Sequence, residues 1–135
     1  MEVGQCADPD RDGVISKAPR LERKNRDLNG DGRQEIVVVD RESCTKDGNC
    51  HWNVFTQVHS RCRRYMGTFA AAHLEPLAIK GDDGFQDVRA WWRLSGDKRV
   101  LLQHYRFRHG GYQIVDALVC RQLEGDRLVC AGQAQ

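Results

Sequence analysis

The sequence predicts a mainly β protein: an antiparallel meander of about seven strands that forms a curled sheet or a sandwich, stapled by disulfides, with little helix. Three observations predict it. Apolar and polar residues alternate in short runs that are separated by Gly- and Asp-rich turns. Six cysteines fall in 135 residues, and two acidic, glycine-containing loops lie near the N-terminus. The length suits one domain, 1–135, with an acidic N-terminal segment (1–34) before an antiparallel β core (35–135).

Composition narrows the class of protein further. Charged residues make up 30% of the chain but the net charge is only +2, so the surface is well solvated without a general attraction to polyanions. No apolar run approaches the ~18 residues of a membrane-spanning helix, so we expect no membrane span. Met1–Val3 has no signal-peptide pattern and suggests either a trimmed mature chain or one begun by an expression vector.

The first acidic loop runs from Asp8 to Ser16, with carboxylates at loop positions 1, 3 and 5 and a glycine at position 6. It resembles an EF-hand or dockerin loop, but its position 12 is Pro19, which supplies no ligand and opposes an exit helix. Two interpretations stay open: a second, weaker calcium site, or an acidic segment packed beside the next loop. The candidate ligands are Asp8, Asp10, Asp12, Val14 and Ser16.

A strongly basic spacer, Lys17–Arg26, joins the two acidic loops. We expect a short helix from Pro19 to Arg26 with a solvated, charged face.

The second acidic loop is the clearest metal motif. Calcium prefers six to eight oxygen ligands at about 2.3–2.6 Å, and alternate residues of a tight glycine-containing loop converge on one point. Position 12 is Val38, inside an apolar strand, where an EF-hand has a glutamate on a helix, so this is not an EF-hand. The expected ligands are Asp27, Asn29, Asp31, the backbone carbonyl of Arg33, and Glu35 directly or through water.

The stretch Asp27–Val39 resembles the calcium hairpins of FG-GAP/VCBS-type repeats, the kind found in integrin α-chains. That resemblance implies that calcium is structural and that the neighbouring surface does the recognising. One loop in 135 residues cannot build the propeller that such repeats usually form, so only the local site carries over. The competing interpretation is an Asx- and Gly-rich turn without metal.

The cysteines predict an oxidising compartment, hence a periplasmic or secreted protein. Asp47-Gly48 lies between Cys44 and Cys50, and a hairpin tip lies between Cys120 and Cys130, so each of these pairs can close locally. Cys6–Cys62 follows by elimination. Zinc is a competing use, because the chain also offers Cys50, His51, His59 and Cys62, although the close cysteine pair of structural zinc sites is missing.

The β core follows in order. Ala70–Lys80 is either a short helix, limited by Pro76, or an extended crossover, and Gly81–Gly84 is a loop. His109–Gly111 predicts a tight hairpin. The expected strands are Glu35–Asp40, His51–Gln57, Cys62–Phe69, Asp87–Leu94, Arg99–Arg108, Tyr112–Arg121 and Arg127–Cys130.

A basic and aromatic surface is the main functional candidate: Arg89, Trp91, Arg93, Arg106 and Arg108. These residue types are enriched in protein-binding hot spots, so we expect a protein or glycan partner. Nucleic acid, which such a face also suits, is not expected outside the cytoplasm. The structural alternative is that the arginine stems cover apolar sheet surface and pair with nearby carboxylates.

No catalytic motif stands out, because neither Ser60 nor Ser95 has the glycine frame of a nucleophile elbow. We therefore expect an extracytoplasmic, calcium-binding interaction module rather than an enzyme. An inhibitor of a periplasmic or secreted hydrolase is the alternative, with Gly81–Gln86 or Cys44–Cys50 as its inserting loop. A small hydrolase ordered by calcium is a third option.

Overall fold

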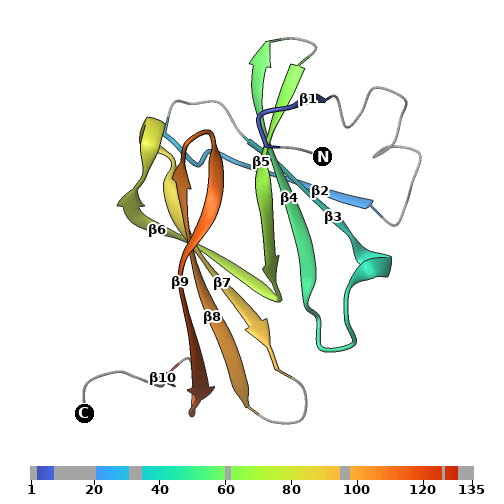
Figure 1. Cartoon of the computed structure of the whole chain (residues 1–135). Helices are drawn as coiled ribbons and strands as arrows, with labels where there is room; N and C mark the ends of the chain where they lie inside the picture. The colour runs from blue at the N-terminus through green and yellow to red at the C-terminus, as the bar shows by residue number, and fades with distance from the viewer. Residues whose placement is uncertain are drawn as a thin grey trace.

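A computed structural model of the chain describes residues 3–7, 21–30, 35–59, 62–94, 98–125 and 127–130, without the side chains of 21–24, 43, 58 and 59. Its strands form two five-stranded antiparallel sheets (Figure 1). The strands are β1 (Cys6–Ala7), β2 (Leu21–Arg26), β3 (Glu35–Asp40), β4 (Cys50–His59), β5 (Cys62–Ala71), β6 (His73–Lys80), β7 (Gln86–Arg93), β8 (Arg99–Arg108), β9 (Gly111–Gln122) and β10 (Leu128–Cys130).

The first sheet has the order β1-β5-β4-β3-β2. β3 lies inside it and is apolar throughout its centre, because both of its edges pair with other strands and both of its faces are covered. The acidic loop that ends at Glu35 is therefore the connection of the β2–β3 hairpin, as the sequence suggested for a loop that feeds a strand.

The second sheet is an uninterrupted meander with the order β10-β9-β8-β7-β6. Its tightest connection is the β8–β9 turn, where His109 and Gly110 have φ angles of 53° and 84°. Glycine reaches this left-handed region without steric cost, and His109 is one of two described non-glycine residues that adopt it.

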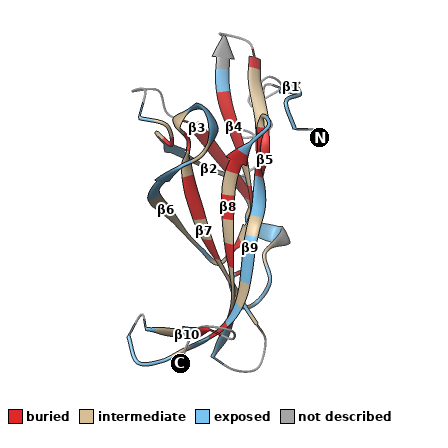
Figure 2. Cartoon of the chain, turned by 60° about the vertical axis from the view of Figure 1, so that its left-hand side comes forward, coloured by how far each residue is buried: buried red, intermediate tan, exposed pale blue. Residues whose placement is uncertain are grey.

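The main core lies where the two sheets pack together, with β5 crossing β7 and β9. Phe69 of the first sheet stacks edge-on against Tyr105 and Tyr112 of the second, with ring centroids 5.0 and 4.9 Å away. The sheets diverge beyond this crossing, so β9 is largely exposed along its length while β7 and β8 keep buried residues (Figure 2).

Two tyrosines in this core have altered acidity. Burial raises the pKa of Tyr105 above its ordinary value of 10.0. Burial also raises the pKa of Tyr112, and the negative charges of Glu35 and Asp87 add to that shift. Both phenols therefore stay neutral in the folded protein well into the alkaline range.

The predicted fold class is confirmed, with corrections in detail. The described residues form ten strands rather than about seven. The expected helix at Pro19–Arg26 is wrong over its described part, because Leu21–Arg26 is strand β2 and pairs along its whole length with β3. For Ala70–Lys80 the extended alternative is correct, and β6 takes Pro76 because an edge strand tolerates a residue without an N–H donor. The only helical turns among the described residues are 3-10 segments, η1 (Arg41–Ser43) and η2 (Asp82–Gly84).

All six cysteines are bonded as predicted: Cys6–Cys62, Cys44–Cys50 and Cys120–Cys130. The zinc interpretation is therefore excluded, because Cys50 and Cys62 are disulfide sulfurs and not thiolate ligands. Three disulfides also indicate an oxidising, extracytoplasmic environment. Among the described residues, no helix is long and apolar enough to cross a membrane.

Candidate functional site

A cleft of about 850 Å³ lies on the outer face of the second sheet, the face turned away from the first sheet. β7 supplies its floor with Arg89, Trp91 and Arg93. Residues of β6 line one side, and Gln122 and Leu128 of β9 and β10 line the other. Because residues from both edges of the sheet line one cleft across β8, the outer face is concave, as expected for a curled sheet, one of the two predicted arrangements.

The row of three floor residues follows from strand geometry. Side chains alternate between the two faces of a strand, and Val88 and Ala90 are buried in the main core at 2% and 0% exposure. Arg89, Trp91 and Arg93 therefore project from the opposite face. Successive members of the row are separated by about 6.7 Å along the strand, twice the rise per residue.

Trp91 stands at the centre of this row. Its indole Nε1 is buried and has no hydrogen-bond partner among the residues that the structure describes. The ring makes an edge contact with His73, whose centroid is 5.9 Å away across the β6–β7 pair. A buried donor without a partner costs about 1–3 kcal/mol. Because Nε1 is shielded from solvent, a ligand contacts the indole ring of Trp91 rather than its N–H.

Neither of the two arginines beside Trp91 forms an ion pair with a described residue. Within the described ranges, no carboxylate lies within ion-pairing distance of either Arg89 or Arg93. Glu75 of β6 stands opposite Arg89 in the strand register but forms no ion pair with it. The floor therefore offers two guanidinium groups without ion-pair partners in the described residues, one on each side of the Trp91 side chain.

The other two residues of the predicted surface behave differently. Arg106 is paired with Asp87, which is completely buried: its Nη2 lies 3.1 Å from Asp87 Oδ2, and its Nε donates to both carboxylate oxygens. His104 Nε2 lies 2.6 Å from the same carboxylate. Arg108 is exposed at the end of β8 and does not line the cleft. The alternative of internal pairing thus holds for Arg106, while Arg89, Trp91 and Arg93 form the cleft.

A smaller pocket of about 120 Å³ adjoins the cleft and shares Arg89 with it. Its apolar wall includes Leu102 and Leu118, which pack on a cluster around the Cys120–Cys130 disulfide. This cluster fills the concave side of the sheet at that end. The disulfide therefore borders the cleft on its own face of the sheet and also closes the last hairpin.

Both ends of β7 are fixed to loops of the first sheet. At the start of β7, the Gln86 amide donates to the Leu28 carbonyl, at 2.7 Å. At its end, the buried Asn49 side chain forms two hydrogen bonds with the backbone of Arg93, each of 2.8 Å. Leu28 belongs to the predicted calcium loop and Asn49 to the Cys44–Cys50 loop, so both loops position the strand that carries the cleft floor.

The described part of the predicted calcium loop contains a side-chain-to-backbone turn. Asp27 Oδ1 accepts a hydrogen bond from the Gly30 amide at 2.9 Å. Glu35 is only 1% exposed; its Oε1 accepts from the Leu28 amide at 2.8 Å and its Oε2 from the Thr56 hydroxyl at 3.2 Å. Glu35 thus holds the loop closed from the inside, through the same Leu28 that contacts β7.

The remaining expected calcium ligands lie outside the described residues. These are Asp31 and Arg33 of this loop and, for the second site, Asp8, Asp10, Asp12, Val14 and Ser16. Within the described residues alone, no group of three or more His, Cys, Asp or Glu side chains is arranged to hold a metal ion. The donors present, Asp27, Asn29 and Glu35, are oxygen donors of the kind that calcium takes, so the loop chemistry fits a hard cation.

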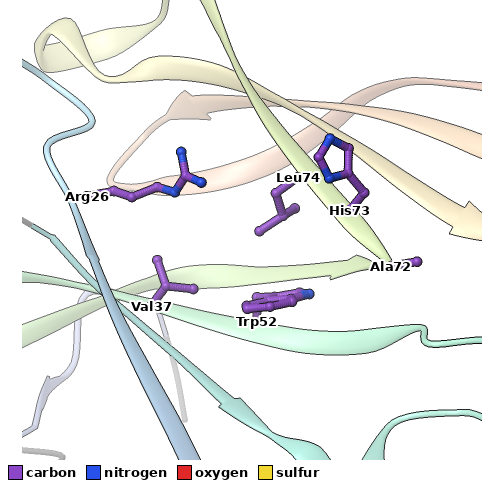
Figure 3. Close-up of a pocket in the computed structure, with 6 residues that line it drawn as sticks. All are labelled: Arg26, Val37, Trp52, Ala72, His73 and Leu74. Carbon is purple, nitrogen blue, oxygen red and sulfur yellow. The ribbon is translucent and has the colours of Figure 1, made fainter. Parts of the chain in front are cut away.

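A third pocket, of about 130 Å³, opens between the sheets (Figure 3). The indole of Trp52 and the side chain of Val37 lie along one side, and Leu74 and Arg26 lie on the other. Trp52 Nε1 already donates to the Ala71 carbonyl at 2.9 Å. Arg26 and His73 also line this pocket, so it offers a ligand both polar and apolar contact.

Comparison with known proteins gives no family for this chain. No protein-family model matches it, and neither the curated proteins nor the solved structures gave a significant match. The FG-GAP/VCBS resemblance therefore rests on the loop residues alone.

The sequence identified the cleft floor but not its walls. His73, Glu75, Gln122 and Leu128 were not predicted. The β6 residues were recoverable in part, because extended pairing of His73–Pro76 with β7 sets His73 opposite Trp91 and Glu75 opposite Arg89. Gln122 and Leu128 reach the cleft only because the sheet curls, and no local sequence pattern predicts the curvature of a sheet.

Proposed function

We propose that this protein is an extracytoplasmic binding module, periplasmic or secreted, whose ligand surface is the cleft on the outer face of the second sheet. One observation carries the proposal: Arg89 and Arg93, without ion-pair partners in the described residues, flank a buried, unpartnered indole N–H on a strand anchored at both ends. Trp and Arg in such a setting are the residues that dominate binding energy in protein interfaces.

Calcium has a structural role in this proposal. The ion is held by Asp27, Asn29, Asp31, the carbonyl of Arg33 and Glu35, and neutralises their carboxylates. It acts on the cleft through Leu28, whose main chain is bonded to Glu35 on one side and to Gln86 at the start of β7 on the other. Ordering of the loop thus reduces the conformational freedom that β7 loses when it binds a ligand.

The inhibitor alternative has less support. An inserting loop must project from the protein, whereas both candidate loops are fastened to the second sheet. Asn49 of the Cys44–Cys50 loop is buried against Arg93, and Asp82 of the Gly81–Gln86 loop accepts a hydrogen bond from the His109 amide at 3.2 Å.

Affinity capture from an extracytoplasmic extract tests the binding surface. The baits are the native protein, the double variant Arg89→Gln/Arg93→Gln and the control Arg108→Gln, an exposed arginine on the same sheet. We expect a component that the native protein and Arg108→Gln retain and that the double variant loses. Equal retention by all three would refute the cleft as the binding surface, and a captured hydrolase that loses activity in the complex would establish the inhibitor.

Thermal unfolding in Ca²⁺ and in EDTA tests the metal. Asp27→Asn keeps the acceptor for the Gly30 amide but removes the charge, and so separates the turn from the metal site. Calcium at a hundred times its dissociation constant should stabilise the native protein by about 2.7 kcal/mol and the variant by much less. An equal melting temperature in Ca²⁺ and EDTA would show that the loop is only a turn.

A further inference from the structure

We propose that the ligand of the cleft is an extended acidic segment of a partner protein, with carboxylate side chains four residues apart and an apolar residue midway between them. The inference rests on the proposed function and names the chemistry of its ligand. It follows from the period of the floor, from its charge and from the kind of hydrogen-bonding groups that it presents.

The period of the floor is the period of a β-strand. Arg89 and Arg93 are four residues apart on β7, about 13 Å, with Trp91 halfway. An extended peptide that lies along β7 repeats its own side chains at the same spacing. Its residues i, i+2 and i+4 therefore face Arg89, Trp91 and Arg93 in turn, in either direction of the chain. Acidic residues at i and i+3 would point to opposite sides of the peptide, so only one would reach an arginine.

The two floor arginines present donors and no acceptor. Each carries five N–H groups in a planar fork that matches a carboxylate. The matching ligand is rich in acceptor oxygens and negatively charged. The indole face and Leu128 on the far wall provide the apolar contact for the middle residue. Among the described lining residues Glu75 alone is acidic, and it opposes an acidic ligand.

The test uses three synthetic peptides, each acetylated and amidated. Asp-Ser-Leu-Ser-Asp has the matched spacing, Asp-Ser-Leu-Asp-Ser has equal charge in the wrong spacing, and Asn-Ser-Leu-Ser-Asn has the spacing without charge. Titrations follow the indole N–H resonances in ¹H–¹⁵N spectra of the calcium-loaded protein, with Trp91 assigned from a Trp91→Phe variant. We expect only the matched peptide to shift Trp91, with a dissociation constant on the order of 0.1–1 mM, which weakens at high salt.

Variants locate the site. Arg89→Gln and Arg93→Gln should each weaken binding about tenfold, the loss of one charge-assisted contact, and Arg108→Gln should leave it unchanged. Glu75→Gln should strengthen binding several-fold because it removes the opposing charge. Unchanged shift dispersion in the free variants shows that each is folded.

Three results would overturn the proposal: equal binding of the two acidic peptides, equal losses in Arg108→Gln and Arg89→Gln, or tight binding of an oligogalacturonate in place of the peptides. The last result would identify an acidic glycan as the ligand. If the peptides fail while captured material still depends on Arg89 and Arg93, the peptide proposal falls and the cleft remains the binding surface. If capture is also independent of Arg89 and Arg93, both the peptide proposal and the proposed binding surface are refuted.

Discussion

Replacement of Glu35 by alanine should destabilise the protein by about 3 kcal/mol. The carboxylate is 1% exposed and accepts hydrogen bonds from the Leu28 amide and the Thr56 hydroxyl, which are themselves buried. A buried donor left unsatisfied costs about 1–3 kcal/mol. Thr56 can rotate its hydroxyl toward another acceptor, but the Leu28 amide is fixed in the backbone. Most of the lost stability therefore comes from the unsatisfied Leu28 amide. The total free energy of unfolding of a domain of this kind is about 5–15 kcal/mol.

Glu35→Gln is the informative companion. Its Oε1 still accepts from Leu28 and its amide can donate to Thr56, so we expect a cost of about 1 kcal/mol. It nevertheless removes the charge that calcium needs, so the stabilisation by Ca²⁺ should shrink sharply. The two variants thus separate the internal hydrogen bonds of Glu35 from its proposed role as a metal ligand.

Urea unfolding of the oxidised protein in EDTA and in Ca²⁺ measures both effects. With a slope of about 1.5 kcal/mol per molar urea, Glu35→Ala should lower the midpoint in EDTA by about 2 M. Glu124→Ala, in the exposed β9–β10 turn, is the control and should stay within about 0.5 kcal/mol. A loss below about 1 kcal/mol for Glu35→Ala, or equal losses for the alanine and glutamine variants, would refute the reasoning.

Three further predictions concern the rest of the fold. Asn49→Ala should cost about 2–3 kcal/mol in urea unfolding and weaken ligand binding at Arg93, because it leaves the Arg93 amide and carbonyl without the partners they have now; an unchanged stability would contradict the clamp. Replacing both cysteines of a disulfide by serine should lower the free energy of unfolding most at Cys6–Cys62, by about 4 kcal/mol, because 56 residues separate this pair. The loss at Cys120–Cys130, separated by 10 residues, should be about 3 kcal/mol. The reverse ranking would show that the chain entropy of the unfolded state does not set the stabilisation by these bonds. The raised pKa values of Tyr105 and Tyr112 contribute stability that is fully present below pH 10 and is lost as the pH rises further, because the unfolded phenols ionise first. Each tyrosine should lower the free energy of unfolding by up to about 1.4 kcal/mol per pH unit in this range. Tyr112→Phe should reduce that slope in urea unfolding from pH 9 to 11, and an unchanged slope would refute the assignment.

Some of the fold could be predicted because its cause is local. The alternation in Asp87–Leu94 and Arg99–Arg108 reports a strand with one buried face, and the Gly110 turn fixes how the next strand returns. The two close disulfides follow from turns between their cysteines. Leu21–Arg26 was mispredicted because its charged residues carry no period-two apolar signal, and its strand state comes from pairing with β3.

The candidate site divides in the same way. Strand periodicity alone places Arg89, Trp91 and Arg93 in one row, so the sequence determined the cleft floor. The strand register decides which arginine forms an ion pair. Asp87 lies opposite Arg106 across the β7–β8 pair and binds it, whereas Arg89 and Arg93 have no such partner among the described residues.

The sequence by itself determined the strands with clear alternation and the two short-range disulfides, because each depends on residues close together in the chain. The tertiary structure decided what those parts do together. Glu35 became a buried acceptor because the first sheet closes over it, and Leu28 and Asn49 hold β7 because the two sheets pack there. The walls of the cleft meet only because the second sheet curls, which depends on contacts between strands far apart in the sequence.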